Sequence, residues 1–147
     1  MMSFLPLSGR EGPGQDGVST SSYGADPTGV SNSRDAIRAA LAAAWSARQD
    51  TGRRQSVYFG PGKFKVTGKD GLRAIDLSGV NGITLIGEPG RTAISFEGDA
   101  GGGDWYLFQI RDGSYDIEFR DLSMDMAITS PDPGEQNHLI QIGTNAN

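Results

Sequence analysis

A repeat with a spacing of 33 and 32 residues constrains the fold more than any other feature of this chain. Residues 74–85, 107–119 and 139–147 each begin with a short apolar segment that runs into a polar turn. In the first two copies a second strand begins at Ile83 and Ile117. Strands and turns repeated at this period are typical of a stacked, solenoid-like fold. The third copy stops before its second strand, so we expect this chain to be the first part of a longer protein.

The alternation of apolar and polar residues changes phase after Phe119. From there the expected inward-facing residues are Leu122, Met124, Met126 and Ile128. Because side chains alternate strictly along a strand, a change of phase indicates a bend between two successive sheets.

One amphipathic helix precedes the strands, and we predict it over residues 32–48. Its apolar residues recur at helical spacing: Ile37, Ala40, Leu41, Ala44 and Trp45. Asn32 is the expected N-cap with Asp35 three residues later, and Gly52 is the expected C-terminal stop. A stack of repeats needs its open end covered, and we expect this helix to be the cap.

Composition excludes several functions. The chain has no cysteine, which rules out disulfides and thiolate chemistry. A net charge of −5 argues against nucleic acid and anionic membrane partners. The apolar runs are too short to span a bilayer, and the N-terminus lacks the basic and apolar parts of a signal peptide. We therefore expect a soluble protein made in the cytoplasm, without membrane insertion.

The first 22 residues predict an extended arm, because Gly, Ser and polar residues dominate positions 8–22. An apolar cluster precedes that stretch, formed by Phe4, Leu5 and Leu7. Two interpretations remain open: a frayed terminus, or a peptide that docks on a partner. The G-x-G-x-x-G pattern at residues 12–17 has no preceding strand and opens no helix, so we expect no nucleotide or other cofactor there.

Candidate chemical groups are sparse, and we assign no catalytic or metal-binding residue. The main acidic cluster consists of Asp112, Asp116, Glu118, Asp121 and Asp125. Glycoside hydrolysis needs two carboxylates across one sugar, but solvated outer faces and turn-forming Asp residues explain this cluster better. Asp99 and Asp104 flank three glycines and would hold an ion only if that loop closed. His138 is the only histidine, and a packing or turn role is expected.

Trp105 and Tyr106 are the candidate glycan contacts. Aromatic faces suit the apolar face of a sugar, although an aromatic pair at the start of a strand often packs in a core. Both interpretations remain open.

Three segments in order carry a family resemblance. Residues 23–40 contain Tyr-Gly-Ala-Asp-Pro-Thr-Gly followed by the helix start, residues 57–66 contain Val-Tyr-Phe-Gly-Pro-Gly, and residues 82–88 read Gly-Ile-Thr-Leu-Ile-Gly-Glu. This region, about residues 18–147, resembles the start of the pectate-lyase-like right-handed parallel β-helix found in phage tailspikes and in some polysaccharide lyases and hydrolases. Gly60 stands where the family usually has Pro.

The resemblance implies a mainly β fold, a right-handed parallel β-helix with an N-terminal capping helix. Together with the composition of the first 22 residues, it divides the chain into a docking arm at 1–22, a first turn and capping helix at 23–56, and the first coils at 57–147. Stacking successive coils about 4.8 Å apart would place Ile83 under Ile117 and Leu85 under Phe119.

For function, we expect the N-terminal region of a phage tailspike or tail fibre. The resemblance implies a homotrimer in the virion that binds host surface glycan through the remainder, with or without degrading it. We expect residues 1–22 to attach it to a tail or baseplate protein. One alternative is the N-terminal part of a polysaccharide lyase or glycoside hydrolase. Another is a purely structural tail or baseplate component. The fold alone does not choose among them.

Overall fold

The structure is a computed structural model, and it describes residues 16–99, 104–129, 134 and 136–143. One α-helix, one short 3₁₀ helix and ten strands make up this part of the chain. Their bounds in chain order are β1 Asp16–Ser19, η2 Thr20–Tyr23, α1 Arg34–Thr51, β2 Gln55–Tyr58, β3 Gly62–Thr67, β4 Arg73–Asp76, β5 Asn81–Ile86, β6 Thr92–Asp99, β7 Trp105–Ile110, β8 Tyr115–Arg120, β9 Ser123–Thr129 and β10 Asn137–Ile142.

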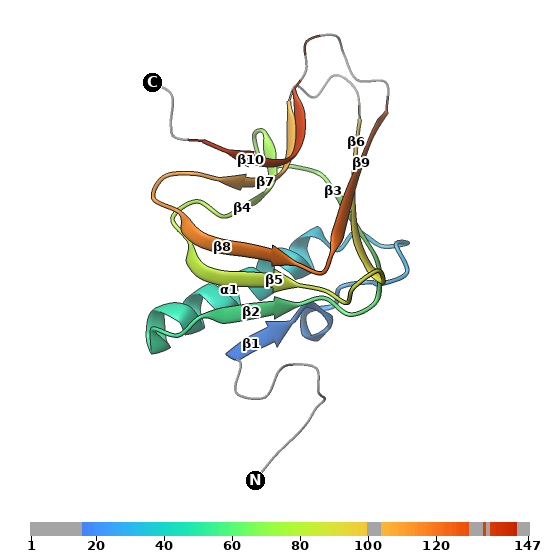
Figure 1. Cartoon of the computed structure of the whole chain (residues 1–147). Helices are drawn as coiled ribbons and strands as arrows, with labels where there is room; N and C mark the ends of the chain where they lie inside the picture. Colours follow the sequence, from blue (N-terminus) through green and yellow to red (C-terminus); the bar gives the residue numbers. More distant parts are fainter. Residues whose placement is uncertain (1–15, 100–103, 130–133, 135, 144–147) are drawn as a thin grey trace.

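The strands form three parallel sheets, and each coil of the chain contributes one strand to each sheet (Figure 1). The sheet orders are β1-β2-β5-β8, β3-β6-β9 and β4-β7-β10. The coils are therefore β2-β3-β4, β5-β6-β7 and β8-β9-β10. Parallel strands joined by such connections make a right-handed coil. This arrangement confirms the predicted right-handed parallel β-helix.

The register of the coils agrees with the sequence repeat. Ile83 pairs with Ile117 and Leu85 pairs with Phe119, as predicted. In the third sheet, Phe108 pairs with Ile75 on one side and with Ile140 on the other. Leu85 and Ile83 are fully buried, so these ladders form the core of the β-helix.

The predicted bend after Phe119 is also present. Asp121 lies between β8 and β9 and has a φ of 55°, a left-handed conformation that Asp tolerates better than most residues. Beyond the bend, Met124 pairs with Ile94 and Met126 pairs with Phe96. Both methionines pack against the core cluster, so the change of phase does mark the passage from one sheet to the next.

The capping helix is present, but its start and end differ from the prediction. It begins at Arg34, with Ser33 in the N-cap position, and continues to Thr51. Asn32 lies outside the helix, but its side-chain oxygen accepts from the Arg34 N–H at 3.1 Å, and its side-chain nitrogen donates to the Thr67 carbonyl of the first coil at 3.0 Å. Gly52 ends the helix as predicted, with a φ of 71° and its N–H donating to the Arg48 carbonyl at 2.9 Å.

One face of α1 is buried in the core, with Ile37, Ala40 and Ala44 each 0% exposed. These residues belong to the same apolar cluster as the inward residues of the first and second coils. In Figure 1, α1 runs alongside β2 and β5 at the end of the stack next to β1. The helix therefore closes this end of the core, as expected of a cap. Among the described residues no helix is long and apolar enough to cross a membrane.

The prediction of an extended arm over residues 1–22 is wrong for residues 16–22, which belong to β1 and η2. β1 extends the first sheet by pairing in parallel with β2, Val18 beside Val57. Asp16 also forms an ion pair with Arg53 at 2.5 Å. The predicted boundary at residue 57 falls inside β2, whose pairing begins at Gln55. The rest of the arm, including Phe4, Leu5 and Leu7, lies outside the described residues.

Candidate functional site

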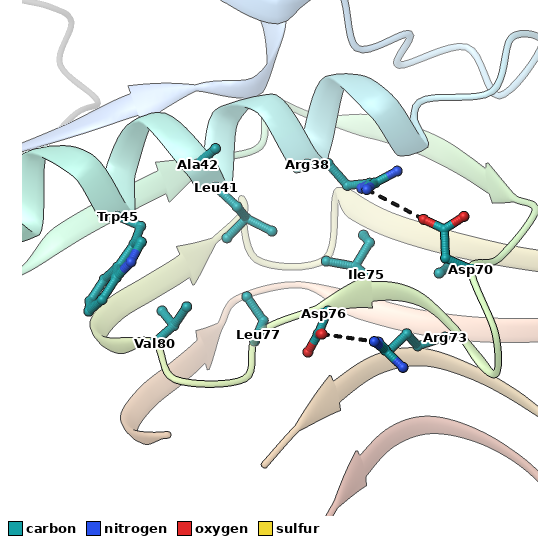
Figure 2. A pocket seen from close by; sticks show the side chains of 11 residues that line it. Arg38, Leu41, Ala42, Trp45, Asp70, Arg73, Ile75, Asp76, Leu77 and Val80 are labelled. Atoms are coloured by element: carbon teal, nitrogen blue, oxygen red, sulfur yellow. Dashed lines mark ion pairs between the residues drawn. The ribbon is translucent and has the colours of Figure 1, made fainter. Parts of the chain in front are cut away.

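A cleft of about 300 Å³ lies between α1 and the segment that carries β4 (Figure 2). One part of its lining is apolar and comprises Leu41, Ala42, Trp45, Ala74, Ile75, Leu77 and Val80. The other part is charged and comprises Arg38, Asp70, Arg73 and Asp76. Figure 2 shows Trp45 and Val80 at one end of the cleft and the Arg38–Asp70 pair at the other. The cleft therefore has both an apolar surface and polar groups.

The four charged side chains of the cleft form two ion pairs. Arg38 lies 3.4 Å from a carboxylate oxygen of Asp70, and Arg73 lies 3.0 Å from one of Asp76. Arg34 binds the same oxygen of Asp70 at 3.0 Å from deeper under the helix. The positive and negative groups that line the cleft are therefore equal in number.

Asp76 is held in its ionised form. Partial burial alone would raise its pKa, but the polar groups of Ser78 and the charges of Arg73 and Arg111 together lower that pKa below its usual range. The backbone N–H of Ser78 donates to the Asp76 carboxylate at 2.9 Å. Asp76 is thus a hydrogen-bond acceptor at neutral pH, not a proton donor.

The edge of β4 that faces the cleft is already occupied by hydrogen bonds. The Arg34 side chain donates to the Ala74 carbonyl at 2.9 Å, and the Asp70 N–H donates to the Arg73 carbonyl at 2.8 Å. An edge strand with free backbone groups would invite another strand to pair with it. These two contacts block such pairing, so the cleft suits a ligand held by side chains.

A second polar surface follows the outer face of the first sheet. Arg54 donates to the Thr84 hydroxyl at 2.8 Å and also pairs with Asp116. Thr84 in turn donates to Glu118 at 3.2 Å. The hydrogen bond from Arg120 is the main cause of a lowered pKa at Glu118. A lowered pKa suits a structural ion pair and is the opposite of what a general acid needs.

The acidic cluster of the sequence is therefore explained by turns and outer faces. Asp112, Asp116 and Asp121 have φ values of 55°, 53° and 55°. Each occupies a left-handed position, where Asp is one of the few non-glycine residues commonly found. Glu118 belongs to the network with Arg120. This finding agrees with the favoured interpretation of the cluster as turn-forming and solvated residues.

The predicted glycan contacts Trp105 and Tyr106 are buried, each 7% exposed. Trp105 packs edge-on against Phe96, with ring centroids 5.7 Å apart, and the Lys69 ammonium lies 4.3 Å from its ring centroid. Tyr106 stacks on His138 at 5.6 Å. Sugar binding by this pair stays a prediction, and the burial favours the packing interpretation that we kept open.

Tyr106 also binds Asp104, its hydroxyl lying 3.2 Å from the carboxylate. Burial and the negative charge of Asp104 raise the pKa of Tyr106, so the phenol stays neutral. His138 is exposed, and its stack on Tyr106 is a packing contact of the kind that we expected. Asp104 also accepts the backbone N–H of Gln136 at 2.7 Å. The side chain of Asp99 lies outside the described residues, and in the described part no three acidic or histidine side chains converge on one metal site.

The cleft residues escaped the sequence analysis. Trp45 is the last residue of the predicted apolar stripe of the helix, but its side chain is only half-buried. Arg73 and Asp76 lie three residues apart on a strand, and this spacing matches no recognised binding motif. The available signal is the position of Trp45 at the end of the stripe, where a large aromatic side chain follows smaller buried residues.

The described architecture defines a class: a parallel β-helix whose first coil is closed by an amphipathic helix. The family "Rhamnogalacturonase A/epimerase, pectate lyase-like" matches residues 17–118, and the chain belongs to this family. That match confirms the pectate-lyase-like part of the predicted resemblance. No curated protein sequence matches the chain.

Two solved structures from Azotobacter vinelandii are similar to this chain. One is the A-module of mannuronan C-5 epimerase AlgE6, with 24% sequence identity and a TM-score of 0.46. The other is the A-module of mannuronan C-5 epimerase AlgE4, with 22% identity and a TM-score of 0.44. Each similarity covers 86% of this chain and 37% of the other. This chain thus spans well under half the length of these structures.

Proposed function

We propose that this chain forms the capped first coils of a larger β-helix protein that acts on polysaccharide. The observation that carries the proposal is the family match across residues 17–118, which includes the cap and the first two coils. Supporting it, the outer faces of the sheets carry polar networks such as Arg54, Thr84 and Glu118, whereas the core is apolar.

The far edge of the stack supports a continuation of the coils. β8, β9 and β10 are terminal strands of their sheets among the described residues. The inward residues Phe119, Met124 and Ile140 are only half-buried, although they continue ladders that are fully buried one coil below. Free strand edges promote aggregation, and a further coil would cover both the edges and these side chains.

We further propose that the larger protein is a phage tailspike or tail fibre. In this proposal residues 1–15 attach it to the tail or baseplate, with Phe4, Leu5 and Leu7 as the docking residues, and three copies assemble into a homotrimer. Host surface glycan binds the later coils. The support is the similarity of the first turn and cap to those of tailspikes.

Antibodies against this chain test the tailspike proposal. We expect them to label the tails of purified phage particles and to block adsorption to the host cell. Detection of the protein only in uninfected bacteria or their medium would contradict it. Labelled tails with no effect on adsorption would favour the purely structural tail or baseplate component.

A secreted or cellular enzyme is the second candidate, and the family description favours it, because it names a rhamnogalacturonase and an epimerase. Glu118, Asp76 and Asp26 all have lowered pKa values and are unsuited to act as general acids at neutral pH. In this candidate the catalytic residues lie on later coils. The test is an assay of the whole protein on acidic and neutral polysaccharides for new reducing ends, for unsaturated products and, by NMR of the polymer, for epimerised residues. The absence of all three changes would contradict this candidate.

A further inference from the structure

We infer that the cleft between α1 and β4 binds one ring of a neutral sugar. This site lies at the capped end of the β-helix, away from the outer faces discussed above. The inference does not rest on the proposed function, because a sugar can bind here whether or not the protein is a tailspike or an enzyme.

The cleft has the size and mixed lining of a small-molecule site. Its volume of about 300 Å³ lies at the lower end of the range for ligand pockets, about 300–1,000 Å³. Leu41, Leu77 and Val80 line it on the apolar side. Such a lining can hold the apolar face of a ring, while the charged groups at the other side fix its orientation.

Trp45 supplies an aromatic surface. Its side chain is half-buried and points from α1 toward Val80 at one end of the cleft (Figure 2). Among the described residues its indole N–H has no hydrogen-bond partner. An amphipathic ring with an apolar body and a free donor fits a sugar, which offers C–H groups on its faces and hydroxyls at its edge.

The charged groups select a neutral ligand. Arg38 is paired with Asp70, and Arg73 is paired with Asp76. An anionic ligand would compete with Asp76 for Arg73, and separating this partly buried pair costs free energy. At the other end, Asp70 already binds both Arg34 and Arg38, so Arg38 is not free to pair with a second anion. A hydroxyl group avoids this cost, because it can donate to a carboxylate and accept from a guanidinium at the same time.

The same groups argue against a peptide segment as occupant. The β4 edge is closed to strand pairing by the contacts of Arg34 and Asp70 described above. An apolar side chain would fill the end near Trp45 but would offer no hydrogen bonds to Arg73 and Asp76. A polyhydroxylated ring satisfies both parts of the lining.

The test is a titration of the 147-residue chain with maltotriose, cellotriose and mannotriose, compared with trigalacturonate. The readout is the indole N–H resonance of Trp45 in two-dimensional NMR spectra, with Trp105 as the buried internal reference. We expect at least one neutral trisaccharide to shift the Trp45 signal with a dissociation constant on the order of 1 mM, and trigalacturonate to bind about tenfold more weakly.

Two variants sharpen the test. Trp45→Ala should weaken binding of the neutral sugar about tenfold, because the aromatic surface is lost. Asp76→Asn should reverse the preference toward trigalacturonate, because Arg73 loses its carboxylate partner. Asp116→Asn, on the outer face of the first sheet, is the matched control and should bind like the wild type. Far-ultraviolet circular dichroism checks that each variant is folded.

Several results would overturn the inference. These are no shift with any of the three neutral trisaccharides, equal binding of trigalacturonate by the wild type, or an unchanged preference in Asp76→Asn. If Trp45→Ala fails to fold, the Asp76→Asn result decides the question alone.

Discussion

The side chain of Asn32 makes two hydrogen bonds with the backbone of Thr67. Its amide nitrogen donates to the Thr67 carbonyl at 3.0 Å, and its amide oxygen accepts from the Thr67 N–H at 3.0 Å. The same oxygen accepts from the Arg34 N–H at 3.1 Å, at the start of α1. One amide therefore joins the end of β3 to the first turn of the capping helix.

We predict that Asn32→Ala lowers the free energy of unfolding by about 2 kcal/mol, since net contributions near 1 kcal/mol are lost at more than one hydrogen bond. Asn32→Asp keeps the acceptor for the two N–H groups but loses the donor and sets a carboxylate oxygen against the Thr67 carbonyl, so it should recover only part of the loss. Urea denaturation followed by circular dichroism measures both. Equal losses in the two variants would contradict the bridging role of the amide.

Asp26 should stabilise the first turn in a pH-dependent way. Its carboxylate accepts from the Thr28 hydroxyl at 2.6 Å and from the Ser31 N–H at 2.7 Å, and these contacts lower its pKa from 3.8 to about 2. A lowered pKa contributes stability that is complete above pH 3.8 and is lost as the pH falls through about 2.

The wild type should therefore be more stable than Asp26→Asn above pH 4, and the difference should shrink between pH 4 and 2. Thermal unfolding across this range measures the difference, and NMR of the Asp26 carboxyl carbon measures the pKa directly. Asp35→Asn, which removes an exposed carboxylate from α1, is the control. A stability difference that stays constant down to pH 2 would refute the prediction.

Leu85 lies in the centre of the ladder between Val57 and Phe119 and is 0% exposed. We expect Leu85→Ala to cost about 2–5 kcal/mol, the range for truncation of a buried leucine. Val30→Ala is the control, because Val30 is 74% exposed and its truncation should change stability by less than about 0.5 kcal/mol. Chemical denaturation of both variants measures the two losses of stability. Similar losses would contradict the prediction.

Gly62 cannot carry a side chain in its present conformation. Its φ is 141°, and a Cβ atom would lie 2.5 Å from the Pro27 carbonyl oxygen. Gly62→Ala should therefore cost about 1–3 kcal/mol. Gly60→Ala in the same turn meets no heavy atom within 4 Å and should be neutral or slightly stabilising, by up to about 1 kcal/mol. Melting temperatures of the two variants test the difference, and a destabilised Gly60→Ala would show that the turn is strained for another reason.

Much of the fold could be predicted because it depends on short-range patterns. The spacing of the repeats placed Ile83 under Ile117 and Leu85 under Phe119, and the structure has both pairs. The apolar stripe of the helix predicted which residues are buried, with Ile37 the clearest example. Alternation and helical periodicity are local properties of the sequence, and they are sufficient to predict the strands, the helix and the stacking of the coils.

Elements that depend on a distant partner were not predictable in this way. β1 is four residues long and mostly polar, and it is a strand only because β2 offers an edge beside Arg53. The sequence predicts the contact of Asn32 with the helix start, but not the additional binding of its amide to Thr67, 35 residues away. For Trp105 and Tyr106 the sequence leaves both packing and sugar contact open, and only the structure shows Phe96 and His138 packed against them.

The sequence by itself determined the class of fold, the register of the coils, and the presence of the cap, because periodic burial specifies which face of each element turns inward. Only the tertiary structure decided where polar groups meet. The cleft exists because α1 places Trp45 and Arg38 opposite Arg73 and Asp76, and these pairs of residues lie 28 to 38 positions apart in the chain. Such a site arises from the packing angle of a helix against a strand, and no local pattern of residues encodes that angle.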